Sequence, residues 1–265
     1  MGFELSRKSW EWLARCDPLW AICTDPRKRG GRWTTAEFFA TGEREIEAVF
    51  RYLDRKGIAV TDRSTALDFG CGVGRLTRAL ASRMDEVYGV DVSPTMIRLA
   101  TELNAGQSGR MHFVLNEERD LRRFADRTFS FIYSSIVLQH VPYPASLGYV
   151  GEFMRLLKPG GALVFQTPTL DRSTLAWRLL RSAARQAVQR LRLPFGRFYM
   201  EMSVIPEEEI GDHAKQEGVE ILDVVNTNST DAGADGTLKF FEEDRGGRLI
   251  SRQFVVRRPT SDTVR

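Results

Sequence analysis

The chain has 265 residues, of which 42% are apolar, and this size and composition fit one elaborated domain better than two. Its 38 basic and 35 acidic residues leave a formal charge of +3, too small to indicate non-specific nucleic-acid binding. The 3 cysteines show no C-x-x-C spacing, which argues against a disulfide framework or a structural zinc site. No apolar run approaches the ~20 residues that cross a bilayer, so we expect a soluble, cytoplasmic protein.

Residues 1–43 form an aromatic- and arginine-rich lead-in that is broken by prolines and by a Gly-Gly pair. This composition predicts short helices joined by loops. Its aromatic residues Trp33, Phe38 and Phe39 could fold over a pocket as a helical lid. Ordinary core packing explains the same residues equally well, so the sequence leaves both interpretations open.

Segment 44–56 predicts an amphipathic helix. Its apolar residues recur at the i, i+3, i+4, i+7 spacing from Ile46 to Leu53, which places them on one helical face. Gly57 follows at the position where a helix commonly ends in a left-handed residue. We expect the main domain to begin with this helix and to span 44–258.

From Thr65 onward, short apolar runs alternate with helical patterns. Ser93 followed by Pro94 is typical of an N-cap and a first helical residue. The alternation indicates a mainly parallel sheet with helices on both faces. We expect strands at 65–69, 87–92, 111–115, 129–134 and 162–166, and helices at 74–84 and after 93.

The region after the fifth predicted strand departs from this alternation, and we expect a helical insertion at 171–200. A helix from Asp171 to about Leu193 would have an apolar side and an arginine-rich side. The simpler interpretation leaves the basic face in solvent. The alternative makes 171–192 a lid for an anionic substrate or a peripheral contact with membrane headgroups. We further expect a helix start at Pro206, strands at 219–225 and 250–257, a loop at 226–249 and a flexible tail at 259–265.

A glycine loop follows the first predicted strand, where Asp68-Phe69-Gly70-Cys71-Gly72-Val73-Gly74 leads directly into a helix. Glycines at alternate positions let the backbone turn tightly and approach a ligand closely. A dinucleotide site requires G-x-G-x-x-G, but Arg75 takes the third glycine position, and Asp68 would lie beside a pyrophosphate. S-adenosylmethionine carries an ammonium and a sulfonium, which a nearby carboxylate favours. The loop therefore favours S-adenosylmethionine over a dinucleotide.

Asp91 ends the second predicted strand. An acidic residue there can accept hydrogen bonds from both hydroxyls of an adenosine ribose. Taken alone, a glycine loop is often only a tight turn, and an Asp at a strand end is often only an N-cap. Ser93 already fits the N-cap position, so the two features together favour a nucleoside site.

Between about Ile46 and Thr167 the chain resembles the class I S-adenosylmethionine-dependent methyltransferases. The resemblance is to the small-molecule group that includes the ubiquinone, menaquinone and many sugar O-methyltransferases. It implies a Rossmann-like α/β fold with a seven-stranded, mainly parallel sheet whose last strand is antiparallel. The turn Lys158-Pro159-Gly160-Gly161 into the fifth strand matches the family well, whereas Ser130 replaces a common Asp.

The resemblance also implies which residues hold the cofactor. It assigns the methionine end to Asp68, Gly70, Gly72 and Gly74, and the ribose to Asp91. The polar residue that meets the adenine amine after the third strand matches Glu117, with Glu118 as a close competitor. Further expected contacts are Cys71, Arg75, Val92, Met96, Ser134 and Ser135.

The segment from Ser134 to His140 follows the fourth strand, where an open parallel sheet places its reactive centre. His140 is the one group in it that could take a proton near neutral pH, as a general base on an acceptor hydroxyl. It could equally brace the turn before Pro142. The resemblance favours the base, because a His at this place acts near the acceptor in several sugar and quinone methyltransferases. Their acidic partner is missing, since that position is Gln166-Thr167.

The same segment disfavours nucleic acid as a substrate. It has no N/D-P-P-Y/F sequence of the kind that grips a base amine and no Pro-Cys nucleophile. The acidic residues between 231 and 244 form no recognisable calcium loop, so we expect no metal. We therefore expect O-methylation of a small molecule, such as a sugar, a glycolipid or a secondary metabolite. N-methylation of a small amine and non-catalytic binding of S-adenosylmethionine remain alternatives.

Overall fold

An eight-stranded sheet organises the computed structural model, which describes residues 2–173, 202–228 and 237–260. The strands are β1 (Thr65–Phe69), β2 (Glu86–Asp91), β3 (Met111–Leu115), β4 (Phe129–Ser134), β5 (Leu157–Asp171), β6 (Glu220–Thr227), β7 (Phe240–Phe241) and β8 (Leu249–Arg257). Their order is β3-β2-β1-β4-β5-β8-β6-β7. Pairs from β3 to β5 are parallel, whereas β8 is antiparallel to both β5 and β6. The chain therefore reverses its direction of winding between β1 and β4, where open sheets bind ligands.

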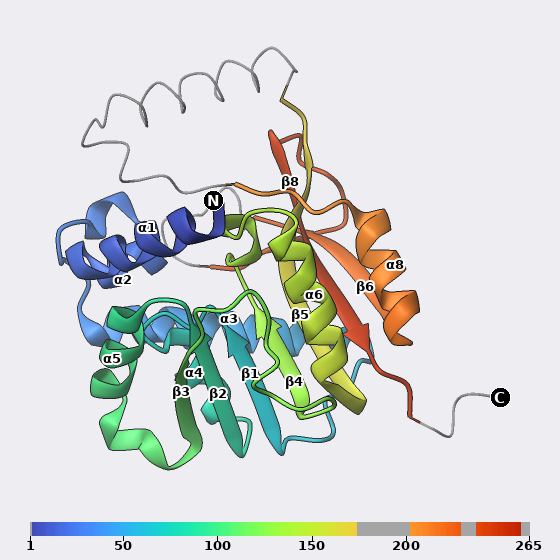
Figure 1. Cartoon of the computed structure of the whole chain (residues 1–265), viewed down its shortest axis with the longest axis horizontal. Coiled ribbons are helices and arrows are strands. Elements are labelled where there is room, and N and C mark those ends of the chain that lie inside the picture. Colours follow the sequence, from blue (N-terminus) through green and yellow to red (C-terminus); the bar gives the residue numbers. More distant parts are fainter. Residues whose placement is uncertain (1, 174–201, 229–236, 261–265) are drawn as a thin grey trace.

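Helices cover both faces of the sheet. They are α1 (Gly2–Cys16), α2 (Pro18–Ile22), α3 (Thr35–Arg55), α4 (Arg75–Ala81), α5 (Pro94–Leu103), α6 (Ala145–Leu156) and α8 (Glu207–Glu217), with 3-10 turns η1 (Pro26–Lys28), η2 (Ala105–Arg110) and η3 (Leu138–His140). In Figure 1, α6 lies in front of the sheet, α3 lies behind it, and α1 and α2 lie across the upper ends of the strands. The lead-in thus packs over one end of the domain.

Two apolar cores fill the space between the sheet and its helices. Successive residues of a strand point to opposite faces, so Ile132 belongs to the core under α6 and α8, and Phe131 to the core under α3 and α4. All of β4 is buried, as expected for a central parallel strand. Together the two cores fix the strand ends that carry the candidate site.

The predicted elements of the domain are largely confirmed. The first, third and fourth strands have the predicted bounds, and Ser93 caps α5 by accepting a hydrogen bond from the Met96 N–H at 3.1 Å. Gly57 follows α3 with φ +69°, as its position predicted. The predicted strand count of seven was wrong, because Phe240–Phe241 in the predicted 226–249 loop pairs with the end of β6 and adds β7.

The helix predicted over 44–56 begins earlier, at Thr35. Thr34 and Glu37 form a capping box, in which Thr34 Oγ1 accepts from the Glu37 N–H at 3.3 Å. The extra turns bury Phe38 and Phe39 in a third core, against Leu13 of α1. These two rings therefore pack against the helices of the lead-in and do not line the cavity described below.

Other predictions fall partly outside the described residues. Most of the basic helix predicted over 171–192 lies outside the described residues, which stop at residue 173 and resume at residue 202. Its first predicted residue, Asp171, is the last residue of β5. Residues 229–236 of the predicted loop and 261–265 of the predicted tail also lie outside the described residues. Among the described helices, none is long and apolar enough to cross a membrane.

Candidate active site

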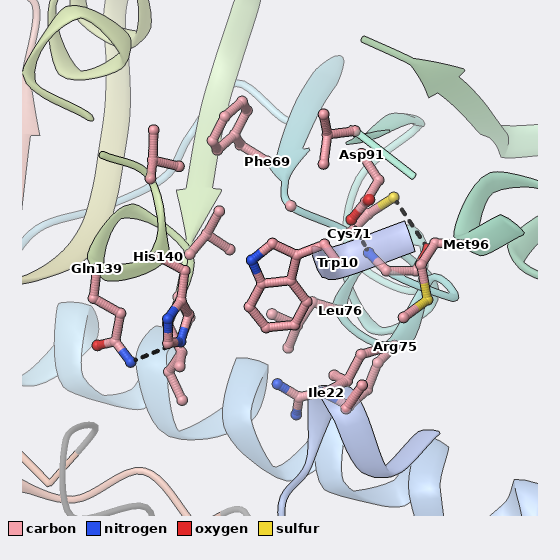
Figure 2. A pocket seen from close by; sticks show the side chains of 18 of the residues that line it. Trp10, Ile22, Phe69, Cys71, Arg75, Leu76, Asp91, Met96, Gln139 and His140 are labelled. Carbon is pink, nitrogen blue, oxygen red and sulfur yellow. Dashed lines mark hydrogen bonds between the residues drawn. The ribbon is translucent and has the colours of Figure 1, made fainter. Parts of the chain in front are cut away.

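A cavity of about 370 Å³ lies at the carboxyl ends of β1, β2 and β4. This volume is within the range of small-molecule sites, ~300–1,000 Å³. Phe3 and Trp10 of α1 and Ile22 of α2 form its cover, and Figure 2 shows the Trp10 indole between His140 on one side and Asp91 on the other. The cavity therefore has two sides, with the glycine loop and Asp91 on one and the segment after β4 on the other.

The glycine loop uses its own N–H groups within the protein. The Gly70 and Cys71 N–H groups both donate to the Val90 carbonyl, at 2.8 and 3.0 Å. The Gly72 N–H donates to Asp91 Oδ2 at 2.9 Å, and the Gly74 N–H donates to the Cys71 carbonyl at 2.9 Å. A phosphate-binding loop directs such groups at its ligand. In this loop those N–H groups already donate within the protein, so the loop suits a ligand that does not require N–H donors.

Gly70 is held in a conformation and a space that only glycine fits. Its φ is +76°, and an added Cβ would lie 2.3 Å from a Val137 methyl. We expect Gly70→Ala to lower the free energy of unfolding by about 2 kcal/mol or more, from backbone strain and overpacking. Gly148→Ala in α6 is the matched control, because an added Cβ there meets nothing within 4 Å. Chemical denaturation should show Gly148→Ala unchanged or slightly stabilised, and equal losses in both variants would contradict this explanation.

Asp91 lines the cavity and is tied to both neighbouring segments. Oδ2 accepts from the Gly72 N–H and Oδ1 accepts from the Ser93 N–H, each at 2.9 Å. Burial raises the pKa of Asp91, although these backbone hydrogen bonds oppose the shift. Each carboxylate oxygen can accept a second hydrogen bond. Asp91 is therefore held in place and can still receive the two hydroxyls of a ribose.

Asp68 lies beneath the glycine loop and does not line the cavity. It is buried, Thr77 Oγ1 donates to its Oδ2 at 2.6 Å, and its Oδ1 has no hydrogen-bond partner among the described residues. Burial raises the pKa of Asp68 to about 7. Of the two predicted aspartates, Asp91 therefore lies in the cavity wall, whereas Asp68 is buried beneath the glycine loop.

The residue after β3 that lines the cavity is Asn116. Its N–H donates to the Asp91 carbonyl at 2.9 Å, which aligns the two strand ends. The predicted Glu117 and Glu118 do not line the cavity: Glu117 is exposed and pairs with Arg7, and the Glu118 carbonyl accepts from Tyr149 at 2.5 Å. Of the predicted neighbours, Cys71, Val92 and Met96 do line it.

Arg75 also lines the cavity but is engaged in a buried ion pair. Its Nη2 donates to Glu45 Oε2 at 2.7 Å, and the Tyr133 hydroxyl donates to Glu45 Oε1 at 2.9 Å. Burial opposes the charge of Arg75, yet Glu45 keeps the pKa of its guanidinium above the ordinary value. These contacts tie α3, α4 and β4 together behind the glycine loop. Gly74, which caps α4 with φ +86°, does not reach the cavity.

The segment after β4 forms the other side. Ser134 is buried and donates to the Phe69 carbonyl at 3.3 Å, whereas Ser135 and His140 line the cavity. The His140 ring lies 5.1 Å from the Trp10 ring, centroid to centroid, and Gln139 Nε2 lies 3.1 Å from His140 Nε2 (Figure 2). The structure therefore brings His140 to the cavity from the side opposite Asp91.

Glu11 fastens helix α1 to the start of α5, beside Asp91. Its Oε2 accepts from Ser93 Oγ at 2.6 Å and from the Thr95 N–H at 3.2 Å, and its Oε1 accepts from Thr95 Oγ1 at 2.7 Å. A carboxylate here also opposes the positive end of the α5 dipole. Burial raises the pKa of Glu11, but these hydrogen bonds outweigh it and lower the pKa to about 2. The cover is thus attached beside Asp91.

We expect Glu11→Gln to reduce the free energy of unfolding by about 1 kcal/mol at pH 7, the size typical of a charge at a helix N-terminus. Because the pKa is lowered in the folded state, this contribution is present above pH 4.5 and is lost as pH falls toward 2. The difference between wild type and variant should therefore narrow below pH 4.5 in denaturation curves. Glu47→Gln, at an exposed position of α3, is the control. A stability difference between wild type and Glu11→Gln that does not change with pH would disprove the role given to the Glu11 carboxylate.

Several residues of the cavity were not predicted as site residues, including Trp10 and Asn116, and Gln139 was expected only as part of the segment from Ser134 to His140. Of these, Asn116 carried a readable signal, since it directly follows the third predicted strand. Trp10 lies far from the loop in sequence, so only the fold brings it there. Among the described residues, no group of three or more His, Cys, Asp or Glu side chains is arranged to hold a metal ion.

Comparisons with known proteins identify similar sequences and similar folds. Residues 66–161 match the family described as "Methyltransferase domain". The chain is 34% identical over 126 residues to a ubiquinone biosynthesis O-methyltransferase of Xylella fastidiosa, covering 47% of this chain and 49% of the relative. The chain thus spans about half the length of the curated relatives it matches.

Solved structures show the same fold at low identity. A putative sarcosine dimethylglycine methyltransferase from Galdieria sulphuraria has a TM-score of 0.55 and 18% identity, over 80% of this chain and 84% of the other. The magnesium protoporphyrin IX methyltransferase from Synechocystis PCC 6803, solved with bound SAH, has a TM-score of 0.53 and 16% identity, over 90% and 92%. These likenesses concern the fold alone.

Proposed function

We propose that this chain, which shares sequence features with the class I S-adenosylmethionine-dependent methyltransferases, transfers a methyl group to a hydroxyl of a small-molecule acceptor. The curated relatives are named as O-methyltransferases of ubiquinone biosynthesis, which supports oxygen as the acceptor atom. The largely apolar lining, with Phe3, Trp10 and Ile136, favours an acceptor with an apolar body. The observation that carries the proposal is a glycine loop with internally donated N–H groups beside the Asp91 carboxylate.

The donor set of the cavity suits S-adenosylmethionine. The loop at Gly70–Gly72 directs its N–H groups inward, so it offers no cradle for a diphosphate. Asp91 would hold the ribose, and Asn116 with Val92 and Met96 would form the adenine side. Asp68 lies beneath the loop, and its Oδ1 has no hydrogen-bond partner among the described residues. Burial raises the pKa of Asp68, and a cationic group bound above the loop would favour its charged form. A cationic nucleoside fits these groups better than an anionic one does.

The acceptor would bind on the side of the segment after β4. When bound, S-adenosylmethionine would supply its sulfonium methyl group for in-line attack by an oxygen lone pair of the acceptor, with S-adenosylhomocysteine as the leaving group. The task of the chain is then to hold the acceptor, and such positioning can supply ~7–11 kcal/mol of a barrier. Trp10 covers this side and His140 forms its wall, so both would contact the acceptor.

Two measurements test the proposal. Calorimetry should detect binding of S-adenosylhomocysteine and not of nicotinamide dinucleotide. Radiolabelled methyl transfer should then be detected with at least one member of a panel of phenols, sugars and amines, with hydroxyl acceptors preferred. Dinucleotide binding without S-adenosylhomocysteine binding would refute the proposal. Cofactor binding without turnover of any panel member would instead support a non-catalytic binder.

We expect His140→Ala to lower kcat by about 10²-fold, the usual loss when a hydrogen-bonding group at a reacting oxygen is removed. The affinity for S-adenosylhomocysteine should not change, because His140 lies across the cavity from Asp91 (Figure 2). His213→Ala on α8 is a control outside the cavity lining. Steady-state kinetics and calorimetry on both variants separate the effect on turnover from the effect on cofactor affinity. An unchanged kcat would show that His140 takes no part in methyl transfer.

A further inference from the structure

We propose that Gln166 and Gln139 form a directional amide relay that fixes His140 in the neutral tautomer with its proton on Nδ1. The amide relay consists of the Ile136 N–H, Gln166, Gln139 and His140, in that order. It makes Gln139 a positioning residue that acts through His140. Only its consequence for methyl transfer rests on the proposed function, since the hydrogen-bond directions do not depend on it.

The direction of the relay is set by a backbone group. The Ile136 N–H donates to Gln166 Oε1 at 2.8 Å, and a backbone N–H can only donate. Ile136 has φ +60°, a rare conformation for a β-branched residue, and such strain is typical of functional sites. Because Oε1 of Gln166 faces this donor, its Nε2 must face the other way.

The amide of Gln166 passes this direction on to Gln139. Gln166 Nε2 donates to Ser251 Oγ at 2.6 Å and to Gln139 Oε1 at 3.3 Å. Ser251 is held in turn by Thr227, with 3.0 Å between the two hydroxyl oxygens. Since the oxygen of Gln139 accepts from Gln166, its NH₂ group faces His140. The chemical identity of each end of both amides is thereby fixed.

The relay ends on the imidazole. Gln139 Nε2 lies 3.1 Å from His140 Nε2, so with Gln139 as donor the imidazole nitrogen must present a lone pair. A neutral imidazole with a bare Nε2 carries its proton on Nδ1. Gln139 is 4% exposed and Gln166 is 2% exposed, which excludes water as a ready substitute partner. Reversing one amide would therefore place two donors face to face in a desolvated site.

This arrangement is the opposite of a His–acid dyad. An acidic partner accepts a hydrogen bond from histidine and stabilises the imidazolium, whereas Gln139 donates to the nitrogen that would have to take the proton. On α1, the Trp10 ring packs beside the imidazole, and Ser6 Oγ donates to the His140 backbone carbonyl at 2.9 Å. Because Gln139 donates to Nε2, His140 acts as a neutral positioning group and not as the general base that its sequence context predicted. Other ionisable residues also line this cavity. Among the described residues they are Arg7, Cys23, Asp25, Glu45, Cys71, Arg75, Asp91 and Tyr149.

Nitrogen-15 NMR of the full chain with labelled histidine tests the relay without cofactor or acceptor. At pH 8 the His140 signals, assigned by their loss in His140→Ala, should show the Nδ1–H tautomer. Gln139→Glu replaces the donor with a carboxylate, so the proton should move to Nε2. Gln139→Met, which has similar length but no amide, should lose the single-tautomer signature. These results together would establish the relay.

A wild-type His140 with its proton on Nε2 would overturn the proposal, as would an unchanged tautomer in Gln139→Glu. Circular dichroism checks that the variants fold, and if Gln139→Glu does not, the wild-type tautomer still decides. The outcome is separable from that of the proposed function. Failure to bind S-adenosylhomocysteine would refute methyl transfer and leave the tautomer unaffected, whereas a wrong tautomer with intact turnover would refute only the relay.

Discussion

Asp91→Asn is expected to weaken the binding of S-adenosylhomocysteine by about 100-fold. Hydrogen bonds to a charged group contribute ~1.5–3 kcal/mol each, and about 2.7 kcal/mol corresponds to this factor. The structure adds a second cost, because both oxygens of Asp91 accept from backbone N–H groups, of Gly72 and Ser93. An asparagine has a single oxygen, so its NH₂ group must face one of these donors. The ribose contact and the shape of the loop are then lost together.

Calorimetric titration measures the affinity, and the ligand-induced rise in Tm provides an independent check. Asp85→Asn is the matched control, since Asp85 is exposed and lies just before β2, at the end of that strand opposite Asp91. It should bind the ligand as the wild type does. If Asp91→Asn also bound normally, the nucleoside could not lie against the end of β2. The interpretation of the cavity as an S-adenosylmethionine site would then fail.

The side of the cavity that carries Asp91 and the glycine loop could be predicted from the sequence because strand ends are local features. Strands β1 and β2 are short apolar runs with clear boundaries, and parallel neighbours bring their carboxyl ends to one edge. Asp91 and the glycine loop could therefore be located from the residue pattern alone, and both line the cavity. The family resemblance favoured Glu117 after β3, whereas the residue there that lines the cavity is Asn116, the first residue beyond the strand.

The cover and the far side could not be predicted in this way. Trp10 reaches the cavity because α1 packs over the strand ends, where Glu11 fastens it to the N-terminus of α5, a contact between residues more than 80 positions apart. Gln139 and Gln166 are likewise brought together by the packing of η3 against β5. Neither contact leaves a periodic pattern in the sequence. The early start of α3 was readable, in contrast, since Thr34 and Glu37 have capping-box spacing.

Glu45→Ala is expected to lower the free energy of unfolding by about 3–5 kcal/mol, because it leaves a buried guanidinium without its counter-ion. Arg75 is 5% exposed and Glu45 is 4% exposed, so the guanidinium would lose its counter-ion at a largely desolvated position. The Tyr133 hydroxyl, which donates to Glu45 Oε1, loses its acceptor at the same time. Glu47→Ala, also on α3, is the control, because its side chain is 56% exposed and pairs with exposed Arg51. Denaturant titration should show a change of about 0.5 kcal/mol or less for the control.

The double variant Glu45→Met with Arg75→Met decides whether the pair serves stability or ligand binding. Replacing both charges with apolar groups of similar length removes the unpaired cation, so stability should recover most of the loss seen for Glu45→Ala. Because Arg75 and Glu45 both line the cavity, binding of S-adenosylhomocysteine to the double variant gives the second answer. We expect it to stay within about tenfold of wild type, since the two charges neutralise each other. A stable double variant that no longer binds would instead make the ion pair part of the ligand site.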